Sequence, residues 1–235
     1  MIDARAVTVK FDGAVVLQQV SVTVAPGAIT GIVGPSGVGK TTLLGVLAGM
    51  MQPHAGTVTW DAQARPTRGS IALLAQHPRL VCNPRWTLDA IVAEPATIRR
   101  ETIDIEAVCD RVGLDTALLQ RFPAQVSDGQ LQRACLARIL VQQPTYILCD
   151  EPTAMLDPIA TRDVMRLLSA LAADGAGLAV VSHDRSVIET LATEHLELGV
   201  ATRRDPTQGS SQANTRVLSA VRFDLWSAAV RKSRR

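Results

Sequence analysis

Short apolar runs separated by turn residues dominate the first 33 positions of the chain. β-branched residues are concentrated in Ala6–Val9, Val15–Leu17 and Val20–Val24, and Pro26-Gly27 ends the last of these runs. Short runs of this composition, bounded by turn residues, are typical of β-strands. The N-terminal segment is therefore expected to be built from β-strands.

Apolar strands then alternate with segments of helical periodicity. Ile29–Val33 is expected to be a buried strand that runs into a glycine-rich loop, and Thr41–Met50 a helix. Tyr146–Cys149 and Leu178–Ser182 are further apolar strands, with a helical pattern over Arg162–Ala173 between them. Because parallel strands need crossover connections, this order predicts an α/β fold with a parallel sheet.

Two segments differ from this alternation. Residues 83–142 have a mainly helical pattern that Pro84, Pro95 and Pro123 interrupt. This pattern predicts a helical insertion. Beyond Val200 the chain is polar and rich in small residues over 206–214, which predicts a linker. Residues 217–230 have the pattern of a short amphipathic element.

Composition narrows the class of protein. The chain has 235 residues, 47% of them hydrophobic and 20% charged, which excludes disorder along its whole length. No apolar run approaches the roughly 18 residues that a membrane helix needs, and the N-terminus lacks a signal-peptide pattern. Four cysteines without a C-x-x-C pair fit a reducing compartment rather than a metal site. We expect a soluble, cytosolic protein whose membrane role, if any, is peripheral.

Charge is unevenly distributed although the net charge is only +2. Residues 201–235 hold eight basic and two acidic side chains, which leaves −4 for the first 200 residues. A net negative charge over the first 200 residues does not attract the phosphate backbone of a nucleic acid, so no nucleic-acid partner is expected. The basic tail is either a solvated terminal segment or a contact for an acidic surface.

The glycine-rich loop after the strand Ile29–Val33 matches G-x-x-x-x-G-K-[ST] without a mismatch. Glycines let backbone N–H groups turn toward phosphate oxygens, and the following helix start adds its positive dipole end. Lys40, one of only three lysines in the chain, would reach the β- and γ-phosphates, and the Thr41 hydroxyl would bind Mg²⁺. A purely structural turn is the alternative. The residues expected to hold a nucleotide here are Gly34, Pro35, Ser36, Gly37, Val38, Gly39, Lys40, Thr41 and Thr42.

A second candidate site, with two acidic residues, lies 110 positions after Lys40. The apolar strand Tyr146–Cys149 runs directly into Asp150 and Glu151. A parallel sheet places such a strand end beside the phosphate loop. Asp150 would hold Mg²⁺ through water, and Glu151 would polarise the attacking water. Alone, an acid pair at a strand end would equally be a solvated cap.

These residues, taken with others in a fixed order, resemble the ATP-binding cassette (ABC) family over about Val7 to Leu198. Gln76 follows an apolar strand as the family's glutamine loop does, and Val126-Ser127-Asp128-Gly129-Gln130-Leu131-Gln132-Arg133 is similar to the family signature. Asp157 resembles the D-loop aspartate, and His183 the switch histidine. The resemblance implies a P-loop NTPase core with an N-terminal antiparallel β-subdomain and a helical subdomain over about 83–142. The cassette would cover residues 1–200, and 201–235 would be a basic C-terminal tail.

The resemblance also implies roles for individual residues. Two cassettes would face each other head to tail, so that Ser127, Gly129 and Gln130 contact the γ-phosphate region of the partner's ATP. Gln76 would touch Mg²⁺ and the attacking water, and His183 the γ-phosphate. Phe11 would stack on adenine. The alternatives are a loop amide for Gln76, a solvated strand-end histidine for His183 and a packed core residue for Phe11. His54, His77 and His195 are expected to be structural or exposed.

The signature departs from the family pattern at Asp128, where the family has glycine. Pointing inward, its carboxylate would repel the partner's phosphates. Pointing outward, it would be an acid at a helix start, where negative charge is favourable. We expect the outward orientation.

The stretch from His77 to Thr87, with Ile91-Val92-Ala93-Glu94-Pro95 after it, resembles the dipeptide, oligopeptide and nickel importers, with the nickel-type build slightly favoured. The resemblance implies an ATP-hydrolysing importer subunit that uses ATP and Mg²⁺. Its partners would be a second cassette, integral membrane permease subunits and, indirectly, an extracytoplasmic substrate-binding protein, at the cytoplasmic side of the membrane.

Three alternatives remain open. The first is a nucleic-acid-associated ATPase of the same superfamily, which the negative body and the lack of a coiled-coil insertion disfavour. The second is a non-hydrolysing scaffold in a soluble complex. The third is a cassette of a phosphonate-degrading lyase system, which shares this architecture.

Overall fold

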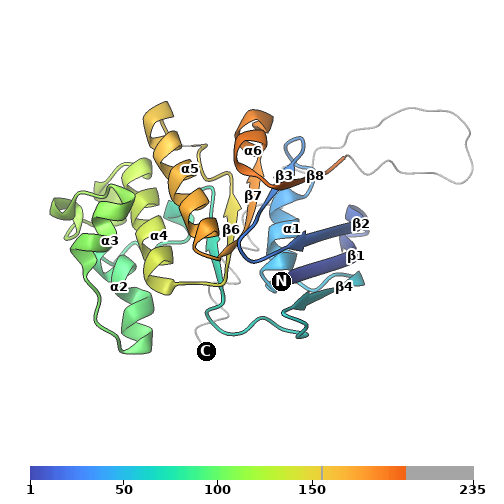
Figure 1. The fold of residues 1–235 in the computed structure, drawn as a ribbon, viewed down its shortest axis with the longest axis horizontal. Helices are drawn as coiled ribbons and strands as arrows, with labels where there is room; N and C mark the ends of the chain where they lie inside the picture. The colour runs from blue at the N-terminus through green and yellow to red at the C-terminus, as the bar shows by residue number, and fades with distance from the viewer. Residues whose placement is uncertain (155, 200–235) are drawn as a thin grey trace, which may run out of the picture.

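The computed structural model describes residues 1–154 and 156–199 (Figure 1). The N-terminal residues form an antiparallel sheet in the order β2-β1-β4, from β1 (Ile2–Phe11), β2 (Ala14–Val24) and β4 (Ala55–Trp60). The expected division of residues 15–24 into two runs is wrong, because both belong to β2. Gln19 has a φ of +50° inside that strand, and this kink interrupts the period-two pattern that the sequence would otherwise show.

The second sheet is parallel, as the alternation of strands and helices predicted. Its order is β5-β6-β7-β3-β8, and every pair in it is parallel. The strand β3 coincides with the expected segment, while β6 and β7 are each one residue longer than expected. The apolar strand expected before Gln76, Ile71–Ala75, is β5 and ends one residue earlier, and β8 was not predicted. The bounds are β3 (Ile29–Val33), β5 (Ile71–Leu74), β6 (Tyr146–Asp150), β7 (Gly177–Ser182) and β8 (Glu194–Glu197).

The helices α5 and α6 connect strands of this sheet, and α1 connects β3 to β4 of the antiparallel sheet. The helix α5 (Pro158–Ala173) begins four residues earlier than predicted, because Asp157 caps it and a proline is tolerated at its first position. The helix α1 covers Lys40–Leu47, so it begins one residue and ends three residues earlier than expected, and α6 covers Arg185–Leu191.

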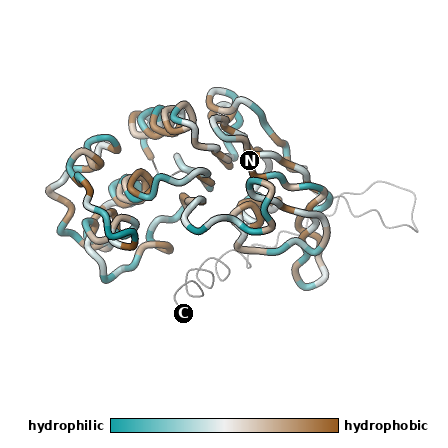
Figure 2. Tube along the Cα trace, turned by 60° about the horizontal axis from the view of Figure 1, so that its bottom comes forward, coloured by the Kyte–Doolittle hydropathy of each residue, from teal (hydrophilic) through white to brown (hydrophobic). Residues whose placement is uncertain are grey.

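The expected helical insertion comprises three further helices with short 3₁₀ turns. Figure 1 shows α2, α3 and α4 together at the end of the molecule opposite the antiparallel sheet. Along these helices hydrophobic positions alternate with hydrophilic ones (Figure 2). The bounds are α2 (Leu88–Arg99), α3 (Ile105–Val112), α4 (Asp128–Gln142), η1 (Pro78–Leu80), η2 (Thr116–Leu118) and η3 (Pro123–Gln125).

The parallel sheet separates two hydrophobic cores. On β6, Ile147 and Cys149 pack into the core shared with α2, α4 and α5, whereas Tyr146 and Leu148 pack into the core shared with α1 and the antiparallel sheet. All five residues of β6 are buried. Burial on both faces explains why this strand is an uninterrupted apolar run rather than an alternating one.

None of the helices within the described ranges is long and apolar enough to cross a membrane. The tail at 201–235, with the linker expected at 206–214 and the amphipathic element expected at 217–230, lies outside the described residues. The boundaries 1–200 and 201–235, and that of the helical subdomain, stay predictions.

Candidate nucleotide-binding site

The glycine-rich loop connects the end of β3 to the start of α1. Gly39 has a φ of +105°, and a Cβ there would lie 2.9 Å from Leu17 Cδ2, so only glycine fits without strain. Lys40 is 3% exposed, and its Nζ donates hydrogen bonds to the carbonyl oxygens of Gly34 at 2.7 Å and Pro35 at 3.0 Å. The lysine amine is therefore held over the loop that the motif predicted as a phosphate cradle.

The ends of two distant segments meet beside this loop. Thr41, in the first turn of α1, donates a hydrogen bond from Oγ1 to Asp150 Oδ2 at 2.6 Å, although 109 positions separate the residues. Asp150 is the last residue of β6 and is buried. A hydroxyl and a carboxylate are hard oxygen donors of the kind that Mg²⁺ prefers, and Mg²⁺ is commonly held by one or two side chains together with phosphates and water. Thr41 and Asp150 fit that pattern; no cluster of three or more His, Cys, Asp or Glu side chains occurs within the described residues.

Two predicted catalytic residues converge on one carboxylate oxygen of the third. Gln76 Nε2 donates to Glu151 Oε2 at 3.1 Å, and His183 Nδ1 lies 3.1 Å from the same oxygen. Gln76 follows β5, Glu151 follows β6 and His183 follows β7, so the parallel pairing of these strands brings the three together. The Glu151 side chain is 10% exposed and that of His183 is 64% exposed, so the imidazole covers the carboxylate on its solvent side.

The backbone at Glu151 is strained in a way that orients its carboxylate. Glu151 has a φ of +49°, in the left-handed region that non-glycine residues rarely adopt. Its N–H donates to the Val181 carbonyl at 2.9 Å, which holds this turn against β7. Strained residues of this kind persist where the surrounding structure fixes them, often at functional sites.

The signature residues form the start of α4. Ser127 is the N-cap: its Oγ accepts a hydrogen bond from Gln130 N at 3.2 Å, and Gln130 Oε1 accepts one from Ser127 N at 2.9 Å. This reciprocal pair is a capping box. Gly129 lies in the first turn, where an added Cβ would sit 3.4 Å from Leu156 Cδ2. The contact of these residues with a partner's ATP stays a prediction.

Asp128 is turned toward Arg79, and its orientation relative to a partner's phosphates stays a prediction. Arg79 Nε lies 2.5 Å from Asp128 Oδ1, and the same guanidinium donates to the carbonyl oxygens of Pro123 at 2.5 Å and Val126 at 2.7 Å. Sequence reasoning missed Arg79. The signal was the unusual acid in the signature, which called for a basic partner nearby.

Gln132, also missed, connects the signature helix to the catalytic strand end. Its side chain is buried, and Nε2 donates to the Pro152 carbonyl, one residue after Glu151. A polar residue on the buried face of a helix needs such a partner, because burying an unpaired amide costs free energy. The polar position beside the apolar Leu131 was the available signal.

Asp157, predicted as the D-loop aspartate, is the N-cap of α5. Its Oδ1 accepts hydrogen bonds from Ala160 N at 3.0 Å and Ile159 N at 2.9 Å. The backbone hydrogen bond from Ala160, reinforced by that from Ile159, lowers the pKa of this carboxyl group below its ordinary value.

The remaining predicted residues have packing contacts or are exposed. Phe11 lies at the end of β1 and is partly buried against the core beside the antiparallel sheet, so its stacking on adenine stays a prediction. His54 accepts a hydrogen bond from Lys10 N at 3.2 Å through Nδ1. His195 is exposed on β8, and His77 is the half-buried N-cap of η1.

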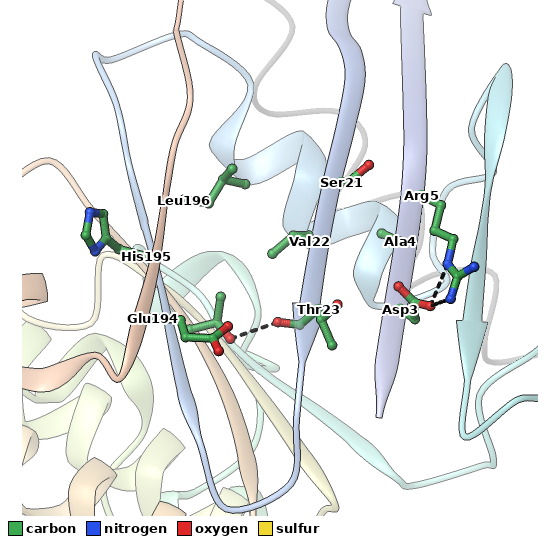
Figure 3. Close-up of a pocket in the computed structure, with 10 residues that line it drawn as sticks. Asp3, Ala4, Arg5, Ser21, Val22, Thr23, Glu194, His195 and Leu196 are labelled. Atoms are coloured by element: carbon green, nitrogen blue, oxygen red, sulfur yellow. Dashed lines mark hydrogen bonds and ion pairs between the residues drawn. The ribbon is translucent and has the colours of Figure 1, made fainter.

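A separate cleft of about 290 Å³ lies between the antiparallel sheet and β8 (Figure 3). Asp3 and Arg5, which form an ion pair, line one side, and Glu194 lines the other. None of the residues predicted to bind nucleotide lines this cleft. It is therefore distinct from the site formed by the phosphate loop and the strand ends.

A strand, a glycine loop and a helix, with carboxylates at the end of another parallel strand of the same sheet, define a P-loop NTPase. The model of the ABC transporter family matches residues 17–154. The chain therefore belongs to the ABC transporter family, and its fold is that of the ATP-binding cassette.

Curated relatives narrow the group. The methionine import ATP-binding protein MetN of Cereibacter sphaeroides is 36% identical over 193 residues, covering 75% of this chain and 54% of MetN. The oligopeptide transport ATP-binding protein OppF of Haemophilus influenzae is 32% identical, covering 74% and 57%. The nickel import system ATP-binding protein NikE of Staphylococcus aureus is 33% identical, covering 81% and 83%. The chain thus spans little more than half the length of MetN and OppF. The resemblance to importer ATP-binding subunits is confirmed.

A solved structure agrees on the fold. A dimeric ATP-binding cassette in a post-hydrolysis state, bound to ADP and Pi, aligns with a TM-score of 0.75 at 26% identity, covering 84% of this chain and 94% of that one. The expected α/β P-loop fold of ABC-cassette type is confirmed.

Proposed function

We propose that this chain binds MgATP at the phosphate loop and hydrolyses its β–γ bond to power import through membrane partners. The observation that supports this most strongly is the convergence of Gln76 and His183 on Glu151 Oε2, next to the Thr41–Asp150 pair. Five residues from four separate motifs meet there, at the end of a loop whose glycines leave backbone N–H groups open to phosphate.

The chemistry follows from these positions. Lys40 would exchange its carbonyl contacts for β- and γ-phosphate oxygens, because an ammonium group gains more from an anion than from a neutral acceptor. Thr41 and Asp150 would hold Mg²⁺, which neutralises charge on the phosphates when bound. Glu151 would accept a hydrogen bond from the attacking water. The water oxygen then bonds to the γ-phosphorus, the bond to the bridging oxygen breaks, and ADP and inorganic phosphate leave.

Gln76 and His183 would position the base. Each holds Glu151 Oε2 at 3.1 Å, which limits rotation of the carboxylate and leaves Oε1 for the water. Positioning and charge neutralisation supply most of the rate acceleration in phosphoryl transfer. The strained backbone of Glu151 supports the same role, because it fixes where the side chain leaves the strand end.

The complete site would form between two cassettes. The N-terminus of α4, with Ser127, Gly129 and Gln130, would contact the γ-phosphate of ATP held by a second cassette, since free backbone N–H groups at a helix start favour an anion. The dimeric cassette among the structural relatives supports this assembly. The ion pair between Asp128 and Arg79 places a positive charge beside the extra carboxylate of the signature, which supports a signature able to approach a partner's phosphates.

The transported substrate would be a peptide or a nickel-type ion, and the chain would act at the cytoplasmic face of the membrane with permease subunits and a binding protein. The import functions printed for OppF and NikE support this assignment. Purification of the tagged chain from native membranes in mild detergent tests it. Two polytopic membrane proteins among the partners are expected, whereas a purely soluble set would favour a lyase-type complex.

Glu151→Gln tests the hydrolytic assignment. The amide keeps the shape of the side chain but cannot accept the proton from water, so phosphate release should fall by about 10²-fold or more, while ATP binding is retained. Glu101→Gln, which alters an exposed glutamate paired with Arg99, is the control and should retain activity. Hydrolysis preserved in Glu151→Gln would remove Glu151 as the base.

A further inference from the structure

Two thiols from distant parts of the sequence lie in contact beside the signature helix. Cys82 Sγ and Cys135 Sγ are 3.5 Å apart, although 53 positions separate the residues. All four cysteines are within the described residues, and none forms a disulfide. Cys82 and Cys135 are half-buried, whereas Cys109 and Cys149 are fully buried. Only the first two therefore combine proximity with some access to solvent.

The contact belongs to a longer line of contacts between η1 and α4. Asp128 and Cys135 are seven positions apart on α4, which is two helical turns, so they lie on the same face. Arg79 and Cys82 are three positions apart, and the turn that joins them closes with Cys82 N donating to the Pro78 carbonyl at 3.1 Å. Arg79 meets Asp128 at one end of this line and Cys82 meets Cys135 at the other. The thiol contact is thus fixed by the same packing that holds the ion pair.

The two thiols are chemically unequal. A hydrogen bond from Cys135 holds the pKa of Cys82 below its ordinary value, and the positive charge of Arg138 acts in the same direction. That hydrogen bond, together with burial, raises the pKa of Cys135 well above its ordinary value. Because the thiolate is the nucleophile in thiol–disulfide exchange, Cys82 is the residue that would react first.

We propose that Cys82 and Cys135 form a reversible dithiol–disulfide site, oxidised by a low-molecular-weight disulfide of the glutathione class, that fastens the segment directly after η1 to α4. The contact distance is compatible with a bond, since a disulfide needs the sulfurs at about 2 Å and the two side chains already face each other. Such bonds are transient and redox-sensing in reducing compartments, the setting expected for this chain.

The reaction balances in two exchange steps. The Cys82 thiolate attacks one sulfur of the oxidant, forms a mixed disulfide and releases one thiolate of the oxidant. The Cys135 thiol then loses its proton to solvent and attacks Cys82 Sγ, which forms the internal disulfide and releases the second thiolate. Two protein thiols are oxidised and one disulfide is reduced to two thiols.

The consequence for catalysis rests on the proposed function. Gln76, six positions before Cys82, contacts Glu151, and α4 begins with the signature residues. A covalent bond between the segment directly after η1 and α4 would fix the position of the glutamine loop relative to the signature. The oxidised chain should therefore hydrolyse ATP several-fold more slowly than the reduced chain.

Peptide mapping of the full chain tests the site directly. The reduced protein is incubated with oxidised glutathione, its remaining thiols are alkylated, and the digest is analysed by mass spectrometry. The expected product joins the peptides of Cys82 and Cys135 and disappears on reduction. Cys135→Ala should instead retain a glutathione adduct on Cys82, and Cys82→Ala/Cys135→Ala should gain neither product in the native state.

The outcomes separate this proposal from the proposed function. A persistent glutathione adduct on wild-type Cys82, a disulfide-linked dimer or unmodified thiols would overturn the dithiol site, because each shows that the internal bond does not form. If the bond forms but turnover is unchanged, the effect on catalysis is refuted. An inactive reduced protein would count against the proposed function alone, since the mapping requires no hydrolysis. The Cys82→Ala/Cys135→Ala variant should keep its turnover in oxidant.

Discussion

Arg79 holds the segment that leads into the signature, and its removal gives a measurable loss of stability. Its guanidinium donates to two main-chain carbonyl oxygens, of Pro123 at 2.5 Å and Val126 at 2.7 Å, and pairs with Asp128. Arg79→Met keeps most of the aliphatic stem and deletes all three contacts. The question is which contact contributes most.

The magnitude can be worked from exposure. The side chains of Arg79 and Asp128 are 42% and 45% exposed, so their ion pair should contribute only about 0.5 kcal/mol. Hydrogen bonds from a charged donor contribute about 1.5–3 kcal/mol each when buried, and partial exposure reduces the two carbonyl bonds to about 1 kcal/mol each. Arg79→Met should therefore cost about 2–3 kcal/mol. Asp128→Asn removes the charge pair and the favourable negative charge at the start of α4, and should cost about 1 kcal/mol.

Urea unfolding followed by circular dichroism measures both variants and their double mutant. The coupling free energy between positions 79 and 128 should be about 0.5 kcal/mol, the value of the ion pair alone. Equal losses in Arg79→Met and Asp128→Asn would refute the reasoning, because they would place the whole contribution in the ion pair. A neutral Arg79→Met would show that the segment is held by other contacts.

Three further changes test other parts of the site. Lys40→Ala should weaken ATP binding by about 10–100-fold, since a charge-assisted contact is lost. Lys10→Ala is the control. Equal ATP affinities of the two variants in a nucleotide titration would refute the phosphate-binding role of Lys40. Ser127→Ala should lower the free energy of unfolding in urea by about 1 kcal/mol, because it removes the cap of α4. Ser127→Asn should keep most of that stability. A Ser127→Ala variant as stable as the wild type would contradict the capping role. The lowered pKa of Asp157 contributes stability that is present above its unfolded pKa and is lost as the pH falls through the folded pKa. Acid unfolding of Asp157→Asn should therefore depend less on pH over that range, and a profile parallel to that of the wild type would exclude this contribution.

The sequence was sufficient for the elements that obey simple local rules. The strand β3 and the loop ending at Lys40 follow from an apolar run and a phosphate motif, and the pairing of Asp150 with Thr41 follows from the parallel order of strands. The order of motifs also placed Gln76 and His183 near Glu151. The strand, the phosphate loop and the acid pair needed only local patterns and a rule about where parallel strands end, whereas Gln76 and His183 came from the resemblance to the ABC family.

Other features depended on contacts between distant residues. The sequence of β2 has the pattern of two separate strands, because the kink at Gln19 is fixed by pairing with β1 and not by local preference. The early start of α5 depends on the cap at Asp157, and cap geometry is weakly encoded in periodicity. The partners of Arg79 and of Cys82 lie 49 and 53 positions away, and no local pattern specifies them.

The alternation of β6 between two cores restricts how the site can move. A slide of one residue along the sheet would exchange the faces of Ile147 and Leu148, and a slide of two would break the pairing of β6 with β5 and β7 at once. The strand is thus a fixed reference, and Asp150 and Glu151 at its end share that fixed position. Opening and closing of the site must come from segments that approach these carboxylates: the glutamine loop after β5, the histidine after β7 and the start of α4.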